Sequence, residues 1–231
     1  KMIMAKKPKE RQEILEKLQK LQKSDFIGIL KAMEGYKVTI RLLDPPLHEF
    51  LPNPETLMDR IYKKKDKSRK TMRVLDRARE LAETNPMMGH RGVRVGITYP
   101  EIYRMQIKAV FEASAYLAKS KVDAKPQIMI PQVGSITELN YIKNIYDDVK
   151  KEMQKKYKMK FKINFGTMLE VVRACLTADE LADTAEFFSF GTNDLTQGTF
   201  SFSGEDVEGK FLPEYMEKEL LERNPFQSID V

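Results

Sequence analysis

Apolar residues along this chain recur at helical spacing in some segments and gather in short runs in others. The first helical stripe between charged positions consists of Ile14, Leu15, Leu18 and Leu21. It predicts an amphipathic helix, and Ser24 predicts the cap of a second, short helix that stops near Gly35. A longer stripe predicts a helix that starts at Ser135, because Ser135 and Glu138 have capping-box spacing. The apolar members of that stripe are Leu139, Ile142, Ile145, Val149 and Met153.

Short apolar runs between the helical segments predict five strands. These runs cover residues 37–43, 93–97, 127–133, 162–168 and 186–190. Pro100 predicts the first turn of a helix that reaches about Lys119, and Thr177 with Glu180 predicts a second capping box. Strands that alternate with single helices are typical of βαβ units. The pattern therefore predicts an α/β fold with a parallel sheet.

Composition narrows the class of protein. The chain has 231 residues, of which 42% are hydrophobic and 32% charged, with a formal net charge of +6. No apolar run has the length of a transmembrane helix, and the basic residues are interleaved with Asp and Glu. We therefore expect no membrane partner and no nucleic-acid partner. One cysteine fits a reducing compartment, so we expect a cytoplasmic location and leave organelle targeting open.

Polar side chains stand at or just past the ends of two predicted strands. Glu170 follows one strand, and Asn193 and Asp194 follow the next. The carboxyl ends of parallel strands meet at one edge of a sheet, where the active residues of such folds lie. With one cysteine and two histidines in the chain, a divalent metal would take carboxylate oxygens. The two carboxylates thus favour Mg²⁺, and the backbone amides around Gly191 and Thr192 favour a small anion.

Two arginines favour an anionic ligand at the same edge. Arg41 lies within an apolar strand, where we expect it to be buried beside an anionic partner. Arg91 lies in a loop with glycines on both sides, where backbone can approach a ligand closely. Paired guanidinium groups suit phosphate and carboxylate groups. Arginines and carboxylates together predict a site for a small, highly anionic substrate held by Mg²⁺.

Each of these residues also has a purely structural interpretation, which stays open at this point. Glu170 and Asp194 could serve helix N-termini, Arg41 could pair with Asp44, and residues 191–194 could form a simple turn. For three further kinds of residue we expect structural roles. His90 should be a hydrogen-bonded loop residue, and Cys175 should be a small buried side chain. The methionines expected as core side chains are Met87, Met88, Met129 and Met168.

Several segments in order resemble the phosphoenolpyruvate-utilising enzyme family. They are TIRLLDPPLHEF (39–50), NPMMGHRGVR (85–94), QIMIPQVG (127–134), FGTMLEVVRA (165–174) and FFSFGTNDLTQGTFSFS (187–203). The resemblance implies a (β/α)8 TIM barrel, of which residues 1–231 would form a partial phosphoenolpyruvate/pyruvate-binding domain. We expect about strands two to six of eight, without the nucleotide-binding and phosphohistidine domains.

The resemblance also implies roles for particular side chains. Arg41 and Arg91 match the arginines that hold the transferring phosphoryl group, and Asn193 matches a catalytic residue that contacts the substrate. Glu170 and Asp194 match the carboxylates that hold Mg²⁺. The further positions that match substrate-contacting or pocket-lining residues of the family are Met168, Ser189, Gly191 and Thr192.

The implied reaction is phosphoryl transfer between a phosphohistidine and pyruvate, which gives phosphoenolpyruvate. Its implied partners are phosphoenolpyruvate or pyruvate, the phosphohistidine domain, and a second copy in a homodimer of the full enzyme. The chain departs from the family at Val171 and Val172, where relatives have Ile-Pro. It also lacks the family's cysteine-bearing segment, so we expect the isolated chain to be inactive. Another branch of the family and a non-catalytic scaffold remain as alternatives.

Overall fold

The computed structural model describes residues 2–5, 8–63, 66 and 68–228. Its strands are β1 (Lys37–Arg41), β2 (Lys125–Ile130), β3 (Asn164–Leu169) and β4 (Phe188–Phe190). The longer helices are α1 (Pro8–Ala32), α2 (Pro54–Tyr62), α3 (Arg69–Leu81), α5 (Pro100–Lys119), α6 (Ile136–Tyr157) and α9 (Thr192–Phe200). The short helices are η1 (Met2–Met4), η2 (Leu47–Phe50), η3 (Pro86–Met88), α4 (Val93–Thr98), α7 (Val172–Leu176), α8 (Ala178–Ala182), α10 (Gly204–Val207) and α11 (Leu212–Glu217).

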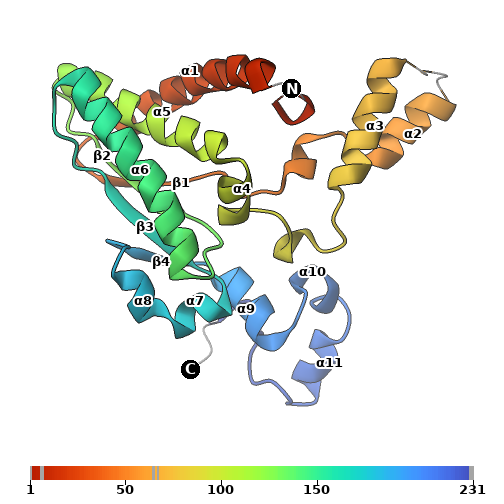
Figure 1. Ribbon diagram of the computed structural model, residues 1–231. Helices are drawn as coiled ribbons and strands as arrows, with labels where there is room; N and C mark the ends of the chain where they lie inside the picture. Colours follow the sequence, from red (N-terminus) through yellow and green to blue (C-terminus); the bar gives the residue numbers. More distant parts are fainter. Residues whose placement is uncertain (1, 6–7, 64–65, 67, 229–231) are drawn as a thin grey trace.

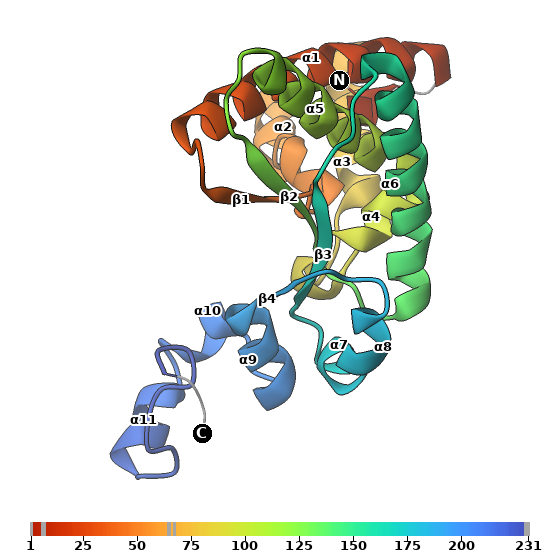
Figure 2. The same cartoon turned by 90° about the vertical axis from the view of Figure 1, so that its left-hand side faces the viewer.

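The four strands form one parallel sheet in the order β1-β2-β3-β4. Helices α1, α5 and α6 lie in a row along one face of the sheet (Figure 1). In the turned view the strands curl, and α9, α10 and α11 extend away from the sheet beyond β4 (Figure 2). This curled arrangement is half of a (β/α)8 barrel. It brings the carboxyl ends of all four strands to one edge, as the alternation of strands and helices predicts.

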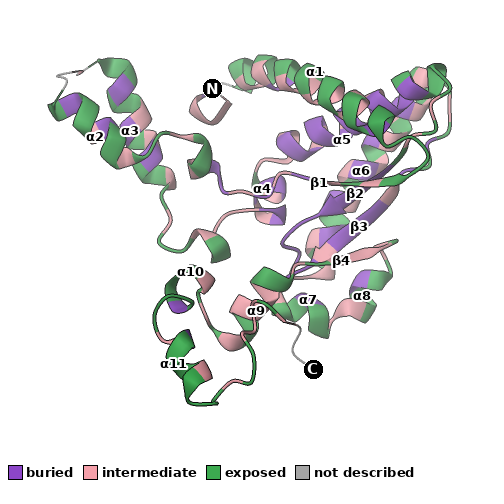
Figure 3. Ribbon diagram, turned by 180° about the vertical axis from the view of Figure 1, so that it is seen from behind, coloured by how far each residue is buried: buried purple, intermediate pink, exposed green. Residues whose placement is uncertain are grey.

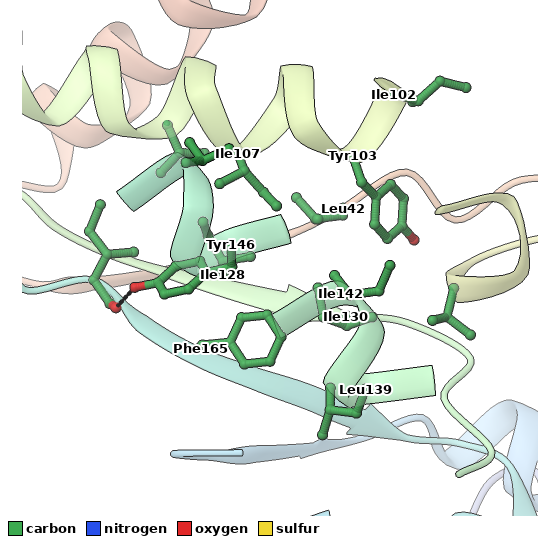
Figure 4. Close-up of a cluster of buried hydrophobic side chains, with 14 of the residues drawn as sticks. Leu42, Ile102, Tyr103, Ile107, Ile128, Ile130, Leu139, Ile142, Tyr146 and Phe165 are labelled. Carbon is green, nitrogen blue, oxygen red and sulfur yellow. Dashed lines mark hydrogen bonds between the residues drawn. The ribbon is translucent and has the colours of Figure 1, made fainter. Parts of the chain in front are cut away.

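The core lies between the central strands and the helices α5 and α6 (Figure 3). Ile128 and Phe165 are fully buried on β2 and β3, and they pack in the same cluster as Leu139 and Ile142 of α6 (Figure 4). The predicted capping box at the start of α6 is confirmed, since Glu138 accepts from the Ser135 N–H at 3.1 Å and donates its own N–H to the Ser135 hydroxyl at 3.4 Å. This cap fixes where the apolar stripe of α6 begins to face the sheet.

Tyr146 adds a polar tie to this core. Its side chain is 1% exposed, and its hydroxyl donates to the carbonyl of Ile163, just before β3, at 2.5 Å (Figure 4). Burial raises the pKa of Tyr146 well above its ordinary value, and the charges of Glu186 and Asp147 raise it further. The phenol therefore stays a hydrogen-bond donor throughout the neutral range.

Replacing Tyr146 with phenylalanine should lower the free energy of unfolding by about 1 kcal/mol, because the carbonyl of Ile163 loses its buried donor. The change can be measured by urea denaturation. Tyr141→Phe is the matched control on the same helix, since Tyr141 is 44% exposed and should tolerate the change. Equal midpoints for the Tyr146 and Tyr141 variants would contradict this role of the hydroxyl.

One predicted strand is wrong. Residues 93–97 form helix α4, so the described part of the chain has four strands and not five. Gly92 starts this helix with φ +57, and the N–H of Gly96 donates to the carbonyl of Gly92 at 3.1 Å. Val93 and Val95 are both buried, as in a short strand of the predicted length. A short buried apolar run does not separate strand from helix by its pattern alone.

Three smaller expectations are also wrong. Ser24 caps no second helix, because α1 runs continuously from Pro8 to Ala32. Thr177 makes no capping hydrogen bond to α8, and its hydroxyl donates to the carbonyl of Arg173 at 3.2 Å. Cys175 is exposed rather than buried.

Among the described residues, no helix combines the length and the apolar character needed to span a lipid bilayer.

Candidate active site

The carboxyl end of β1 is held in place by side chains of α5. The N–H of Leu43 donates to Gln106 Oε1 at 2.9 Å, and the Leu43 carbonyl accepts from the Tyr103 hydroxyl at 2.9 Å. Both α5 side chains are buried, and burial raises the pKa of Tyr103 well above its ordinary value. These bonds fix the backbone immediately before Asp44.

Asp44 is the buried centre of the arginine pair. It is 4% exposed, and its carboxylate accepts from Arg91 Nε at 3.2 Å and from Arg91 Nη2 at 2.5 Å. Arg41 Nη1 approaches the same carboxylate at 3.5 Å. Burial works to lower the pKa of Arg91, but the hydrogen bonds and charge of Asp44, with the charges of Asp194 and Glu170, outweigh it, so the pKa is raised. Asp44 thus holds both guanidinium groups, and Arg91 stays charged.

The loop that carries Arg91 is fastened to the ends of two strands. The N–H of Gly92 donates to the Asp44 carbonyl at 2.9 Å, and the N–H of Val93 donates to the Pro131 carbonyl at 3.1 Å. Gly92 has φ +57, and a Cβ at this position would lie 2.6 Å from the Cβ of Gln132. Glycine is needed here both for the left-handed backbone and for the close approach.

Glu170 lies directly after β3 with its carboxylate turned into the protein. It is 3% exposed, and its Oε1 accepts from the N–H of Gln132 at 2.6 Å. Its Oε2 is buried and has no hydrogen-bond partner among the described residues. Burial raises the pKa of Glu170, and the charges of Asp44 and Asp194 raise it further, against the opposing effect of the Gln132 N–H and Arg91. A buried acceptor without a donor calls for a cation or a proton.

Asp194 lies in the first turn of α9 and faces the same group. Its Oδ1 is 3.6 Å from Arg91 Nη1 and accepts from Gln132 Nε2 at 3.4 Å. Gly191, directly before α9, lets this turn approach β3 closely. A Cβ on Gly191 would lie 2.6 Å from the Cβ of Glu170 and 2.8 Å from its Oε2.

The structure brings most of the predicted site residues together. Contacts connect six of them around Asp44 and Gln132, namely Arg41, Arg91, Met168, Glu170, Gly191 and Asp194. Ser189 on β4 stands in register with Met168 on β3. Thr192 and Asn193 are exposed and line a neighbouring cavity of about 380 Å³, whose other wall includes residues 225–228.

Some structural interpretations of these residues are correct and others are not. Arg41 pairs with Asp44, as the structural alternative has it, but 45% of its side chain is exposed, so the expected burial is wrong. β1 lies at the edge of the sheet and alternates between exposed and half-buried residues. Residues 191–194 begin a helix rather than forming an isolated turn. His90 is hydrogen-bonded, with Nε2 2.6 Å from Thr98 Oγ1.

Of the four methionines that we expect as core side chains, Met129 is buried, whereas Met168 is half-buried. Met87 is 39% exposed and Met88 is 66% exposed, although both were expected as core side chains. The Met87 sulfur lies 3.7 Å from Arg91 Nη1, and the Met168 sulfur lies 3.9 Å from Arg41 Nη1. The thioethers therefore pack beside the guanidinium groups.

The sequence patterns do not identify two residues of the site. They indicate Asp44 only as an alternative partner of Arg41, and they do not single out Gln132. The signal for Gln132 is a polar residue at the end of the apolar run QIMIPQV. Its backbone has φ +59, which is uncommon for a residue other than glycine. Among the described residues, no group of three or more His, Cys, Asp or Glu side chains could by itself hold a metal ion.

Comparisons with known proteins identify the family of the chain. A family model described as "PEP-utilising enzyme, PEP-binding domain" matches residues 2–226. The chain is 53% identical over 237 residues to a pyruvate, phosphate dikinase of Entamoeba histolytica and 48% identical over 234 residues to chloroplastic pyruvate, phosphate dikinase 1 of Arabidopsis thaliana. It is 45% identical over 231 residues to a pyruvate, phosphate dikinase of Clostridium symbiosum. Each match covers 100% of this chain but only 27%, 24% and 26% of the respective relative. The chain thus spans about a quarter of their length.

Proposed function

This chain belongs to the PEP-binding domain family of the PEP-utilising enzymes, and we therefore propose that it supplies the phosphoenolpyruvate/pyruvate half-site of a pyruvate, phosphate dikinase. The observation that carries the proposal is the buried Oε2 of Glu170, which has no hydrogen-bond partner in the described part of the chain and lies near Asp194 and the paired arginines. The matched relatives with the dikinase name favour this branch over phosphoenolpyruvate synthase or enzyme I. The whole enzyme would convert ATP, phosphate and pyruvate to AMP, pyrophosphate and phosphoenolpyruvate.

The residues of the site fit a bound Mg²⁺. Glu170 and Asp194 supply two carboxylates from neighbouring segments, and Glu170 holds one oxygen without a donor. Oxygen atoms of water and substrate would fill the other coordination positions, which is usual for Mg²⁺. When bound, the ion would polarise the oxygen of the pyruvate enolate and offset its negative charge. We therefore propose Mg²⁺ as the cofactor.

The arginines would hold the phosphoryl group. Asp44 binds Arg91 through Nε and Nη2, so the third nitrogen, Nη1, is left facing Asp194. Arg41 adds a second guanidinium with nearly half of its side chain exposed. The negatively charged phosphoryl oxygens would accept hydrogen bonds from guanidinium groups that Asp44 already holds in place. Preorganised donors of this kind stabilise the charge that develops during phosphoryl transfer.

The remaining predicted residues would contact the rest of the substrate. Thr192 and Asn193 carry hydrogen-bonding groups in the neighbouring cavity, and we propose that they and Gly191 bind the carboxylate and phosphoryl oxygens. Met168 and Ser189 would line the pocket from β3 and β4. In the whole enzyme, a phosphohistidine domain would deliver the phosphoryl group, and two copies of the enzyme would form a homodimer.

We also propose a cytoplasmic location, although some plant relatives are named chloroplastic.

The proposal predicts that Mg²⁺ and oxalate, a mimic of pyruvate enolate, together raise the thermal unfolding midpoint of the chain. A ligand that binds only the folded state stabilises it by about 2.7 kcal/mol at a hundredfold excess over its dissociation constant. Asp194→Asn should remove the shift, since it removes a proposed ligand charge. Asp206→Asn is the control, because Asp206 lies in α10 and forms an exposed pair with Lys210. No shift in the unaltered chain would count against the half-site and in favour of a non-catalytic scaffold.

A further inference from the structure

Gln132 occupies an unusual position at the carboxyl end of β2. It is 4% exposed, although it is polar, and its backbone has φ +59. This left-handed conformation is sparsely populated by residues with a side chain and is found preferentially at functional sites. Its Cβ and Cγ are covered by Gly92, where an added Cβ would lie 2.6 Å and 2.8 Å from them. The surroundings therefore fix both the backbone and the start of the side chain.

Gln132 contacts both carboxylates of the proposed cation site. Its backbone N–H donates to Glu170 Oε1 at 2.6 Å, and its side-chain Nε2 donates to Asp194 Oδ1 at 3.4 Å. Arg91 Nη1 approaches that same Oδ1 at 3.6 Å. These contacts engage one oxygen of each carboxylate, and they leave Glu170 Oε2 and Asp194 Oδ2 for a cation.

This arrangement bears on which cation can bind. A carboxylate with one oxygen engaged by a donor offers its other oxygen as a monodentate ligand. Mg²⁺ takes six oxygens in a near-octahedral shell and retains water, so it accepts monodentate carboxylates. Ca²⁺ takes six to eight oxygens and often uses both oxygens of a carboxylate. A fixed amide donor on Asp194 therefore disfavours the larger ion.

We propose that Gln132 is a positioning residue that selects Mg²⁺ over Ca²⁺ by holding Glu170 and Asp194 as monodentate ligands. The inference rests on the proposed function, because it assumes that these two carboxylates bind the cation. It goes beyond that function in assigning ion selectivity to a neutral residue that would not itself touch the ion.

The test uses metal alone, without substrate. Mn²⁺ bound to the chain is followed by electron paramagnetic resonance, and Mg²⁺ or Ca²⁺ is titrated in as competitor to obtain the ratio of their affinities. Gln132→Gly keeps the backbone N–H and suits a positive φ, whereas Gln132→Leu keeps a side chain of similar length without the amide. Gln127→Leu is the matched control. Gln127 is likewise a buried glutamine, but it lies within β2, away from the carboxyl end of the strand, and accepts a hydrogen bond from Thr39.

Both Gln132 variants should lower the preference for Mg²⁺ over Ca²⁺ by about tenfold. Without the amide donor, Asp194 Oδ1 keeps, among the described residues, only its longer contact to Arg91 and can turn to the larger ion as a second ligand oxygen. Gln127→Leu should leave the ratio unchanged. A merely structural role would weaken both ions equally, so an unchanged ratio in the Gln132 variants would overturn the inference while leaving the proposed function intact. If the unaltered chain binds none of the three ions, the proposed cation site and the inference are both overturned.

Discussion

Replacing Asp44 with alanine should lower the free energy of unfolding by about 3 kcal/mol, since removing one partner of a buried ion pair leaves the other charge uncompensated. Arg91, whose side chain is only 12% exposed, would lose the two hydrogen bonds that hold its guanidinium group. Arg41 would lose its carboxylate as well. We therefore expect weaker binding of oxalate in addition to the loss of stability. Urea denaturation and oxalate titration measure the two effects separately.

The matched control for this prediction is Asp123→Ala. Asp123 pairs with Lys125 at 2.9 Å, but the Asp123 side chain is 62% exposed. An exposed pair of this kind contributes less than about 1 kcal/mol. If the Asp44 and Asp123 variants lose the same small amount of stability, Asp44 is not the buried centre of the arginine pair. Asp44→Asn, which keeps an acceptor oxygen but loses the charge, should fall between the two.

Replacing Gly191 with alanine should remove cation-dependent oxalate binding, although the substitution itself removes no charged group. The added methyl would lie 2.6 Å from Glu170 Cβ, 2.8 Å from Glu170 Oε2 and 3.2 Å from the Met168 sulfur. Gly191 has φ −94, so alanine meets no backbone obstacle there and the effect is one of space. Either Glu170 or the start of α9 has to shift, at a cost of about 1–3 kcal/mol for overpacking. Thermal unfolding with and without Mg²⁺ and oxalate measures both consequences.

Gly209→Ala provides the comparison for this steric effect. A Cβ on Gly209 would meet no atom of the described residues within 4 Å. We expect the Gly209 variant to keep the stability of the unaltered chain and its response to Mg²⁺ and oxalate. A Gly191 variant that also keeps that response would show that Glu170 tolerates displacement, and would argue against its role as a cation ligand.

The starts of the two helices that cover the central strands, α5 and α6, could be predicted because their signals are local. The capping box at Ser135 and the proline at position 100 mark the starts of α6 and α5, and both helices begin where predicted. The helix at residues 93–98 could not be predicted, because its few apolar residues suit a buried strand equally well. Its contacts with the rest of the fold are also not local, since Gly92 lies against Gln132 and Gly96 lies against the ring of Tyr103.

The order of apolar and polar residues is enough to predict strands that alternate with helices, and hence polar residues gathered at one edge of a parallel sheet. Which atoms meet at that edge depends on how distant segments pack together. Asp44 and Arg91 are 47 positions apart, and Gln132 and Asp194 are 62 apart, so no local pattern relates them. The burial of Asp44 and the left-handed backbone of Gln132 depend on packing between these distant segments. Periodicity fixes the face on which a side chain lies, whereas the partner of a buried charge is fixed by the fold that removes water around it.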